Sequence, residues 1–206
     1  MWQITLDARR SLIATFEELH DEQWEVRSLC DAWRIRDVLA HLILAARPPA
    51  RRYVPALLKA RGSFDRANHC LAIEDGRRPP ADLIATYREV AGHQFSPPGW
   101  PEEAPLSDIL LHSLDVRIPL KVGAAIPPHH YEPVLQLLFT RVGRSFTSPR
   151  RPDVRWVAED HDWSYGDGPE VHGPMESLAL TAAGRGARLG SLEGAGVAAV
   201  KNWARR

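Results

Sequence analysis

Three polar residues interrupt a strongly apolar stretch in the middle of the chain. Pro105–Leu120 reads PLSDILLHSLDVRIPL, and its Ile, Leu and Val residues predict a helix that also carries Asp108, His112 and Asp115. At about 100° per residue, these three side chains share one helix face. Burying charge is costly unless the groups are paired or bind a metal. The spacing therefore predicts an acid and imidazole stripe that faces the interior, with Arg117 on the solvent side.

A second predicted helix repeats this spacing. Asp37 and His41 lie four residues apart in RDVLAHL, so they also share a helix face. Two helices that each present such a pair inward are able to enclose a cation. Two imidazole nitrogens and one carboxylate, with a position left for water or ligand, are a common catalytic zinc site. The same donors accept nickel, iron or manganese.

The same residues also have a purely structural interpretation. An Asp and a His four residues apart on a helix often form a simple surface pair, worth about 0.2–0.5 kcal/mol. A single buried His is more often hydrogen-bonded within a core than bound to a metal. Asp115 lies a turn beyond His112, which favours a supporting or structural role over a ligand role.

The composition is that of an ordinary globular protein. The formal net charge is zero, which argues against nucleic-acid binding and gives no reason to expect a membrane-surface role. The separated cysteines Cys30 and Cys70 indicate a reducing compartment and, for each thiol, core packing. No run of about 18 apolar residues and no signal-peptide core are present, so we expect a cytoplasmic protein.

Apolar periodicity predicts four helices in the first part of the chain. Their ranges are 5–19, 34–46, 81–92 and 105–120, and residues 50–60 extend the second helix or form a kinked continuation of it. The Gly, Asn and Asp residues between 62 and 80 indicate irregular structure. Several helices joined by loops favour a four-helix bundle over residues 1–123.

The remainder of the chain, residues 124–206, has the pattern of a small α/β domain. Its alternating segments 153–160 and 162–166 predict strands, and GDGPEVHG at 166–173 predicts turns. Helices are predicted near 131–143, 174–184 and the C-terminus. The expected fold class is α+β, with an N-terminal bundle and a smaller C-terminal domain.

Three segments taken together resemble the mycothiol-dependent maleylpyruvate isomerase family, a relative of the DinB-like bundles. They are LCDAWRIRDVLAHL, LSDILLHSLDVRIPL and WSYGDGPEVHGPMESLALTAAGR, and they occur in the order found in that family. The resemblance implies a DinB-like four-helix metal-binding domain followed by a small α/β domain. It also implies a divalent metal, usually zinc, held by His41, Asp108 and His112. Arg185, in the terminal Gly-Arg pair, would lie near the site.

The sequence departs from the family pattern at three positions. Asp108 stands where the characterised isomerases carry a glutamate, which is one methylene longer. Arg34 precedes the second helix where many relatives have a Ser or Thr that caps it, which leaves Asp31 as the expected cap. Lys121 stands where a glycine is common.

The resemblance implies an enzyme that uses mycothiol, the low-molecular-weight thiol of actinobacteria, as a cosubstrate. The expected reaction is the cis–trans isomerisation of maleylpyruvate or a similar acid. The alternatives are a mycothiol S-transferase acting on an electrophilic small molecule, and a metal-binding module without catalysis. Asp37 and Asp115 are expected to orient the imidazoles, and Arg185 either stabilises negative charge in the reaction or complements a helix dipole.

Overall fold

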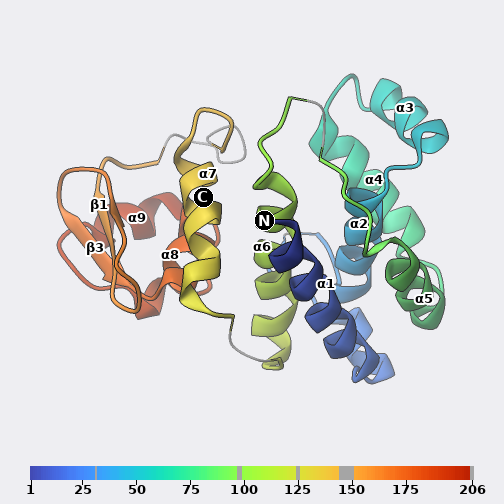
Figure 1. The fold of residues 1–206 in the computed structure, drawn as a ribbon, viewed down its shortest axis with the longest axis horizontal. Helices are drawn as coiled ribbons and strands as arrows, with labels where there is room; N and C mark the ends of the chain where they lie inside the picture. Colours follow the sequence, from blue (N-terminus) through green and yellow to red (C-terminus); the bar gives the residue numbers. More distant parts are fainter. Residues whose placement is uncertain (31, 97–98, 124–125, 144–150, 205–206) are drawn as a thin grey trace. The chain divides into compact units, whose positions relative to one another are not determined.

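The computed structural model describes residues 1–30, 32–96, 99–123, 126–143 and 151–204 (Figure 1). The chain forms two compact units. The first comprises residues 1–98 and 108–123, and the second comprises residues 99–107 and 124–206. Helices make up the first unit and a small sheet with helices makes up the second, so the predicted α+β fold class is confirmed. Asp31, the expected helix cap, lies outside the described residues.

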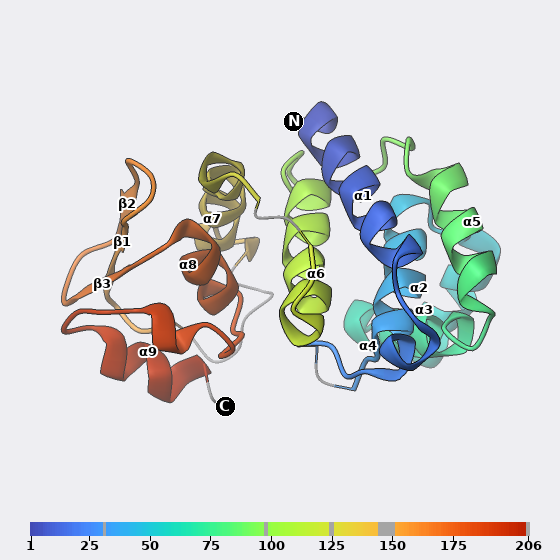
Figure 2. The same cartoon turned by 90° about the horizontal axis from the view of Figure 1, so that it is seen from below.

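The first unit contains the four predicted helices together with two more. Its helices are α1 (Trp2–Glu17), α2 (Ile35–Ala46), α3 (Ala50–Lys59), α4 (Phe64–Asp75), α5 (Pro80–Val90) and α6 (Ala104–Leu120), of which the first turn of α6 is assigned to the second unit. A 3-10 helix, η1 (Asp21–Glu25), follows α1. Two views at right angles show α1 lying between α6 and α5 (Figures 1 and 2). The predicted helices of the bundle are therefore α1, α2, α5 and α6.

Apolar side chains from these helices form the core of the first unit. Leu12 on α1, Leu39 on α2, Leu83 on α5 and Leu110 on α6 are completely buried. Burying one such side chain contributes about 1.5–3 kcal/mol. The periodic apolar positions therefore fix which face of each helix turns inward.

The prediction of irregular structure between residues 62 and 80 is wrong, because α4 occupies most of this segment. Ser63 begins the helix, and its Oγ accepts a hydrogen bond from the backbone N–H of Arg66 at 3.3 Å. Leu71 and Ala72 are buried, and α4 packs against α2. An N-terminal cap and tertiary packing thus outweigh the modest helix propensity of the intervening polar residues.

The predicted solvent face of α6 is also wrong. Arg117 retains 7% exposure, and its Nη2 donates a hydrogen bond to Ser11 Oγ on α1 at 2.9 Å. Ser113, four residues before Arg117 on α6, is buried as well. A helix that is apolar on most sides is a core helix rather than a surface one, and its arginine therefore finds an internal partner.

The end of α6 accounts for one of the sequence departures. Lys121 has a φ of 55°, a left-handed conformation that glycine adopts more readily. The N–H of Val122 donates to Arg117 O at 3.2 Å, and that of Lys121 donates to Ile118 O at 3.3 Å. This is a Schellman motif, in which glycine is the usual residue at the position of Lys121.

The second unit is built on a three-stranded sheet. Its strands β1 (Arg155–Ala158), β2 (Ser164–Tyr165) and β3 (Glu170–Gly173) have the order β2-β1-β3. Strand β2 pairs antiparallel with β1, and β3 pairs parallel, with Val171 opposite Trp156. The prediction that residues 166–173 form only turns is wrong, because the turn ends early. Gly166 and Gly168 have positive φ, and buried Val171 then joins the sheet.

The helices of the second unit are α7 (Glu132–Phe139), α8 (Met175–Ala182) and α9 (Val197–Ala204). Short 3-10 helices also occur, at η2 (Pro128–Tyr131) and η4 (Leu189–Ser191). Helix α8 packs against β1, β3 and α7 (Figure 2). Trp156 and Leu178 are almost completely buried at this packing surface, so the second unit has a core of its own.

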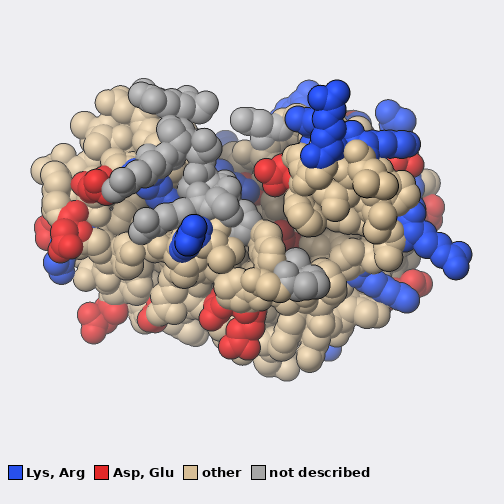
Figure 3. All heavy atoms as spheres, turned by 90° about the horizontal axis from the view of Figure 1, so that it is seen from above, with Lys and Arg blue, Asp and Glu red and all other residues tan. Residues whose placement is uncertain are grey.

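Although the formal net charge is zero, charged side chains are unevenly distributed over the surface. Exposed Lys and Arg side chains gather on the first unit around α3 and its flanking segments (Figure 3). They include Arg47, Arg51, Arg52, Lys59 and Arg61. Arg52 is paired with Glu74 and Asp75. In the part of the chain that the structure describes, no helix is long and apolar enough to cross a membrane.

Candidate metal centre

Helices α2 and α6 bring two imidazoles and a carboxylate together inside the first unit. His41 Nε2 lies 3.2 Å from Asp108 Oδ1, and His112 Nε2 lies 3.6 Å from the same oxygen. One possible ligand atom from each residue lies within 4.8 Å of the others. Two ligands about 2.0–2.1 Å from a tetrahedral zinc lie about 3.3 Å apart. The donor types and their spacing therefore fit a divalent metal.

This cluster is buried but not closed. His41 and His112 retain 8% and 9% exposure, whereas 29% of the Asp108 side chain is exposed. Burial raises the pKa of Asp108, but His41, His112 and, more weakly, Arg9 outweigh that effect and lower it below its ordinary value. Asp108 is thus held as a carboxylate, the form that binds a cation.

A second carboxylate supports His112 from the other side of its ring. Asp115 is completely buried, and its Oδ2 lies 2.8 Å from His112 Nδ1. Burial lowers the pKa of His112, but Cys30, Asp115 and Asp108 together raise it well above its ordinary value. A hydrogen bond at Nδ1 leaves the Nε2 lone pair of a neutral imidazole directed at the cluster. His41 differs, because its buried Nδ1 has no hydrogen-bond partner in the part of the chain described.

Cys30 belongs to this arrangement, although the sequence predicted a packing role for it. Its Sγ donates a hydrogen bond to Asp115 Oδ2 at 3.0 Å and lies 3.7 Å from His112 Nδ1. Cys30, His112 and Asp115 therefore form a second group of possible metal donors that shares His112 with the first. Cys70, by contrast, is exposed, so its predicted core role is wrong.

The prediction that Asp37 orients an imidazole is wrong. Its carboxylate accepts hydrogen bonds from the backbone N–H, Nε and Nη2 of Arg34, all between 2.9 and 3.0 Å. Asp37 is the third residue of α2, where a carboxylate satisfies a free N–H and complements the helix dipole. This pairing also explains how α2 begins without a Ser or Thr cap.

Trp33 covers the two imidazoles, a role that the sequence analysis missed. The centroid of its ring system lies 4.9 Å from that of His41 and 5.8 Å from that of His112. Its Nε1 donates to His69 Nδ1 at 3.2 Å, which places His69 beside the cluster. The signal in the sequence was the position of Trp33 immediately before α2, but only the fold brings His69 to it.

Arg185 lies in the second unit, just after α8 and the left-handed Gly184. Its Nη1 donates to Ala183 O at 3.2 Å, so part of the guanidinium completes the end of α8. Its expected action at the cluster in the first unit stays a prediction.

The fold and the cluster define a helical bundle with a candidate metal centre, followed by a smaller α/β unit. Residues 5–94 match the family model of the mycothiol maleylpyruvate isomerase N-terminal domain. The resemblance predicted from the sequence is thereby confirmed. The matched region contains His41 but ends before α6. Asp108 and His112 are therefore assigned to the candidate site from their distances in this structure.

Two solved structures share the fold across nearly the whole chain. One is a crystal structure of the mycothiol-dependent maleylpyruvate isomerase, at 15% identity, with a TM-score of 0.62, covering 94% of this chain and 91% of that chain. The other is a histidine-to-alanine mutant of that enzyme, at 14% identity with the same TM-score and coverage. At this identity the likeness establishes the fold. No curated protein gives a significant match.

Proposed function

We propose that this protein is a metal- and thiol-dependent enzyme whose metal, most simply Zn²⁺, is held by His41, Asp108 and His112. The observation that carries the proposal is the convergence of two Nε2 atoms on one Asp108 oxygen, at 3.2 and 3.6 Å. The family match of residues 5–94 supports mycothiol as the thiol. Cys30 and Cys70 form no disulfide with each other, which supports a reducing, cytoplasmic location.

Each residue around the cluster has a distinct part in this proposal. A divalent metal bound here would lower the pKa of a ligated thiol and so supply a thiolate nucleophile. Asp115 fixes the ring of His112 through Nδ1, and the thiol of Cys30 satisfies the same carboxylate. Trp33 lies over both imidazoles and limits the access of water to them. The exposed part of Asp108 leaves an approach for a small molecule.

The proposed reaction is a cis–trans isomerisation. The thiolate of mycothiol adds to the double bond of a cis-unsaturated oxo acid such as maleylpyruvate, and the adduct rotates about the resulting single bond. Expulsion of the thiol then restores the double bond in the trans form. Negative charge develops on the enolate oxygen, and we assign its stabilisation to Arg185, since preorganised donors at developing charge are the largest common source of catalysis.

Elemental analysis tests the metal site. Protein purified without added metal is expected to carry stoichiometric zinc or another divalent ion, and His112→Ala is expected to lose it. His129→Ala is the matched control, because His129 is exposed and belongs to neither donor group. Metal-free wild type, or full retention of metal by His112→Ala, would overturn the assignment.

A thiol balance tests the reaction. Incubation of the metal-loaded protein with mycothiol and maleylpyruvate should form the trans acid while free thiol stays constant. Consumption of thiol with formation of a thioether would identify an S-transferase instead. Bound metal with neither product would identify a non-catalytic metal-binding module.

A further inference from the structure

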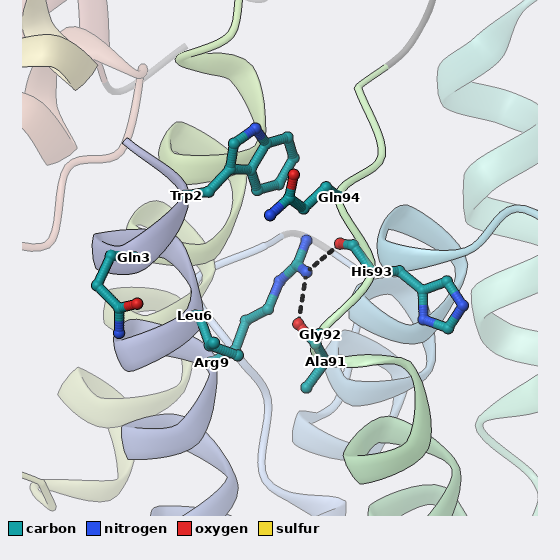
Figure 4. A pocket seen from close by; sticks show the side chains of 8 residues that line it. All are labelled: Trp2, Gln3, Leu6, Arg9, Ala91, Gly92, His93 and Gln94. Carbon is teal, nitrogen blue, oxygen red and sulfur yellow. Dashed lines mark hydrogen bonds between the residues drawn. The ribbon is translucent and has the colours of Figure 1, made fainter.

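A small cavity lies in the first unit, between the start of α1 and the segment that follows α5 (Figure 4). It has a volume of about 70 Å³, which is room for several waters or a small organic acid. Its lining residues are Trp2, Gln3, Leu6, Arg9, Ala91, Gly92, His93 and Gln94. None of them belongs to the candidate metal centre.

The side chain of Arg9 forms the inner wall of this cavity. Arg9 retains only 4% exposure, and its Nη1 donates to Ala91 O at 2.8 Å and to His93 O at 2.9 Å. No described residue accepts a hydrogen bond from its Nε or Nη2, and no described carboxylate forms an ion pair with it. The other terminal nitrogen points towards Trp2 and Gln94 (Figure 4).

Capping the C-terminal end of α5 accounts for only one of the terminal nitrogens of Arg9, Nη1. The two carbonyls bonded to Nη1 follow the last turn of α5, where a cation complements the helix dipole. A guanidinium has five N–H donors, and a buried charge without a counter-ion is costly. The nitrogens that do not bond these carbonyls are therefore available to a ligand in the cavity, which Arg9 lines.

The acid whose pKa Arg9 lowers, Asp108, already has other partners. The charge of Arg9 contributes to lowering the pKa of Asp108, but the carboxylate of Asp108 is bonded to His41 and faces His112. Arg9 and Asp108 form no ion pair in the described part of the chain. The positive charge of Arg9 therefore lowers the pKa of Asp108 without being neutralised by an ion pair.

We propose that this cavity binds the carboxylate group of a small organic acid. Nε and Nη2 lie on one edge of the planar guanidinium, and they donate to the two carboxylate oxygens in the bidentate geometry that favours Arg over Lys. Trp2 and Leu6 supply an apolar wall for the hydrocarbon part of the acid, and Gln94 offers an amide at the rim. The site stands whether or not the His41 cluster binds a metal.

Arginine NMR on the full chain tests this proposal. The Nε–Hε signal of Arg9 is assigned by its loss in Arg9→Lys, or in Arg9→Gln if the first variant does not fold. At constant pH and ionic strength, acetate should shift this signal saturably. Acetamide, its uncharged analogue, should leave the signal in place, and inorganic phosphate should shift it less than acetate does.

Two variants sharpen the test. Gln94→Glu places a carboxylate at the rim of the cavity and should abolish the acetate-dependent shift, since Gln94 is exposed and tolerates the change. Arg88→Lys, on exposed Arg88 paired with Glu17, should retain the shift. An Arg9 signal indifferent to acetate, an equal response to phosphate, or an undiminished response in Gln94→Glu would each overturn the proposal.

Discussion

Asp115 holds His112 through a buried hydrogen bond of 2.8 Å between Oδ2 and Nδ1, three residues apart on α6. Asp37 precedes His41 by four residues on α2 and makes no such contact, because Asp37 is bonded to Arg34. An acid one turn after a histidine thus supports the imidazole in α6, whereas an acid one turn before a histidine caps the helix in α2.

This difference predicts opposite results for two matched variants. Asp115→Asn should weaken zinc binding about 10- to 100-fold, the usual effect of removing a carboxylate behind a ligating histidine. Asp37→Asn should leave zinc affinity unchanged and lower the free energy of unfolding by about 1 kcal/mol, through the weakened cap. Competition with a chromophoric chelator measures affinity, and urea unfolding measures stability. Equal losses of affinity in the two variants would contradict the assignment of Asp115.

Bound zinc should counteract the pH dependence of the stability of the metal-free protein. The pKa of His112 in the folded, metal-free protein is raised above its ordinary value of 6.5. Its stabilising contribution is therefore fully present below about pH 6.5 and is lost as the pH rises through the folded pKa. Zinc, in contrast, binds the unprotonated imidazole, so its affinity increases over the same range.

Urea unfolding between pH 6 and pH 9 measures this effect. The free energy of unfolding should fall with increasing pH after treatment with a chelator, and this slope should flatten in His112→Gln. With zinc in excess the decline should be smaller or reversed. At the acidic end, the lowered pKa of Asp108 gives stability that is present above its ordinary value of 3.8 and is lost as the pH falls through its folded pKa.

Substitution of Arg185 distinguishes a role in the reaction from a structural role at the end of α8. If it stabilises developing charge, Arg185→Ala should lower kcat about 10²- to 10³-fold with little change in thermal midpoint. Arg188→Ala is the matched control, because Arg188 lies three residues on and pairs with Glu176 at 3.5 Å. A lower thermal midpoint with unchanged kcat in Arg185→Ala would show that Arg185 only completes the helix.

Lys121 offers a test of stability away from the cluster. Because its φ of 55° suits glycine, Lys121→Gly should raise the free energy of unfolding by up to about 1 kcal/mol. Lys59→Gly, within the last turn of α3, should lower it by about 1 kcal/mol. Urea denaturation of both variants compares the two effects. A loss of stability in Lys121→Gly would mean that the lysine side chain outweighs the backbone strain.

The sequence was sufficient to predict secondary structure where the apolar periodicity of a segment decides its structure. The apolar positions of α1, α2, α5 and α6 predicted these helices, and the Asp-xxx-His spacing placed Asp108 and His112 on one face. The failures at α4 and β3 have a common origin. Ser63 caps a segment of weak propensity that packing on α2 stabilises, and Val171 enters a strand because β1 is beside it.

By itself, the sequence determined helices α1, α2, α5 and α6, the inward acid and imidazole stripe, and the order of the motifs. Only the tertiary structure decided that Arg117 is buried against Ser11, that Cys30 donates to Asp115 and that Trp33 covers His41. It likewise left Arg9 facing a cavity with two nitrogens unbonded in the described chain. The physical reason is that spacing along a helix fixes which residues share a face. The partner opposite that face comes from a distant segment, whose position depends on packing of the whole unit.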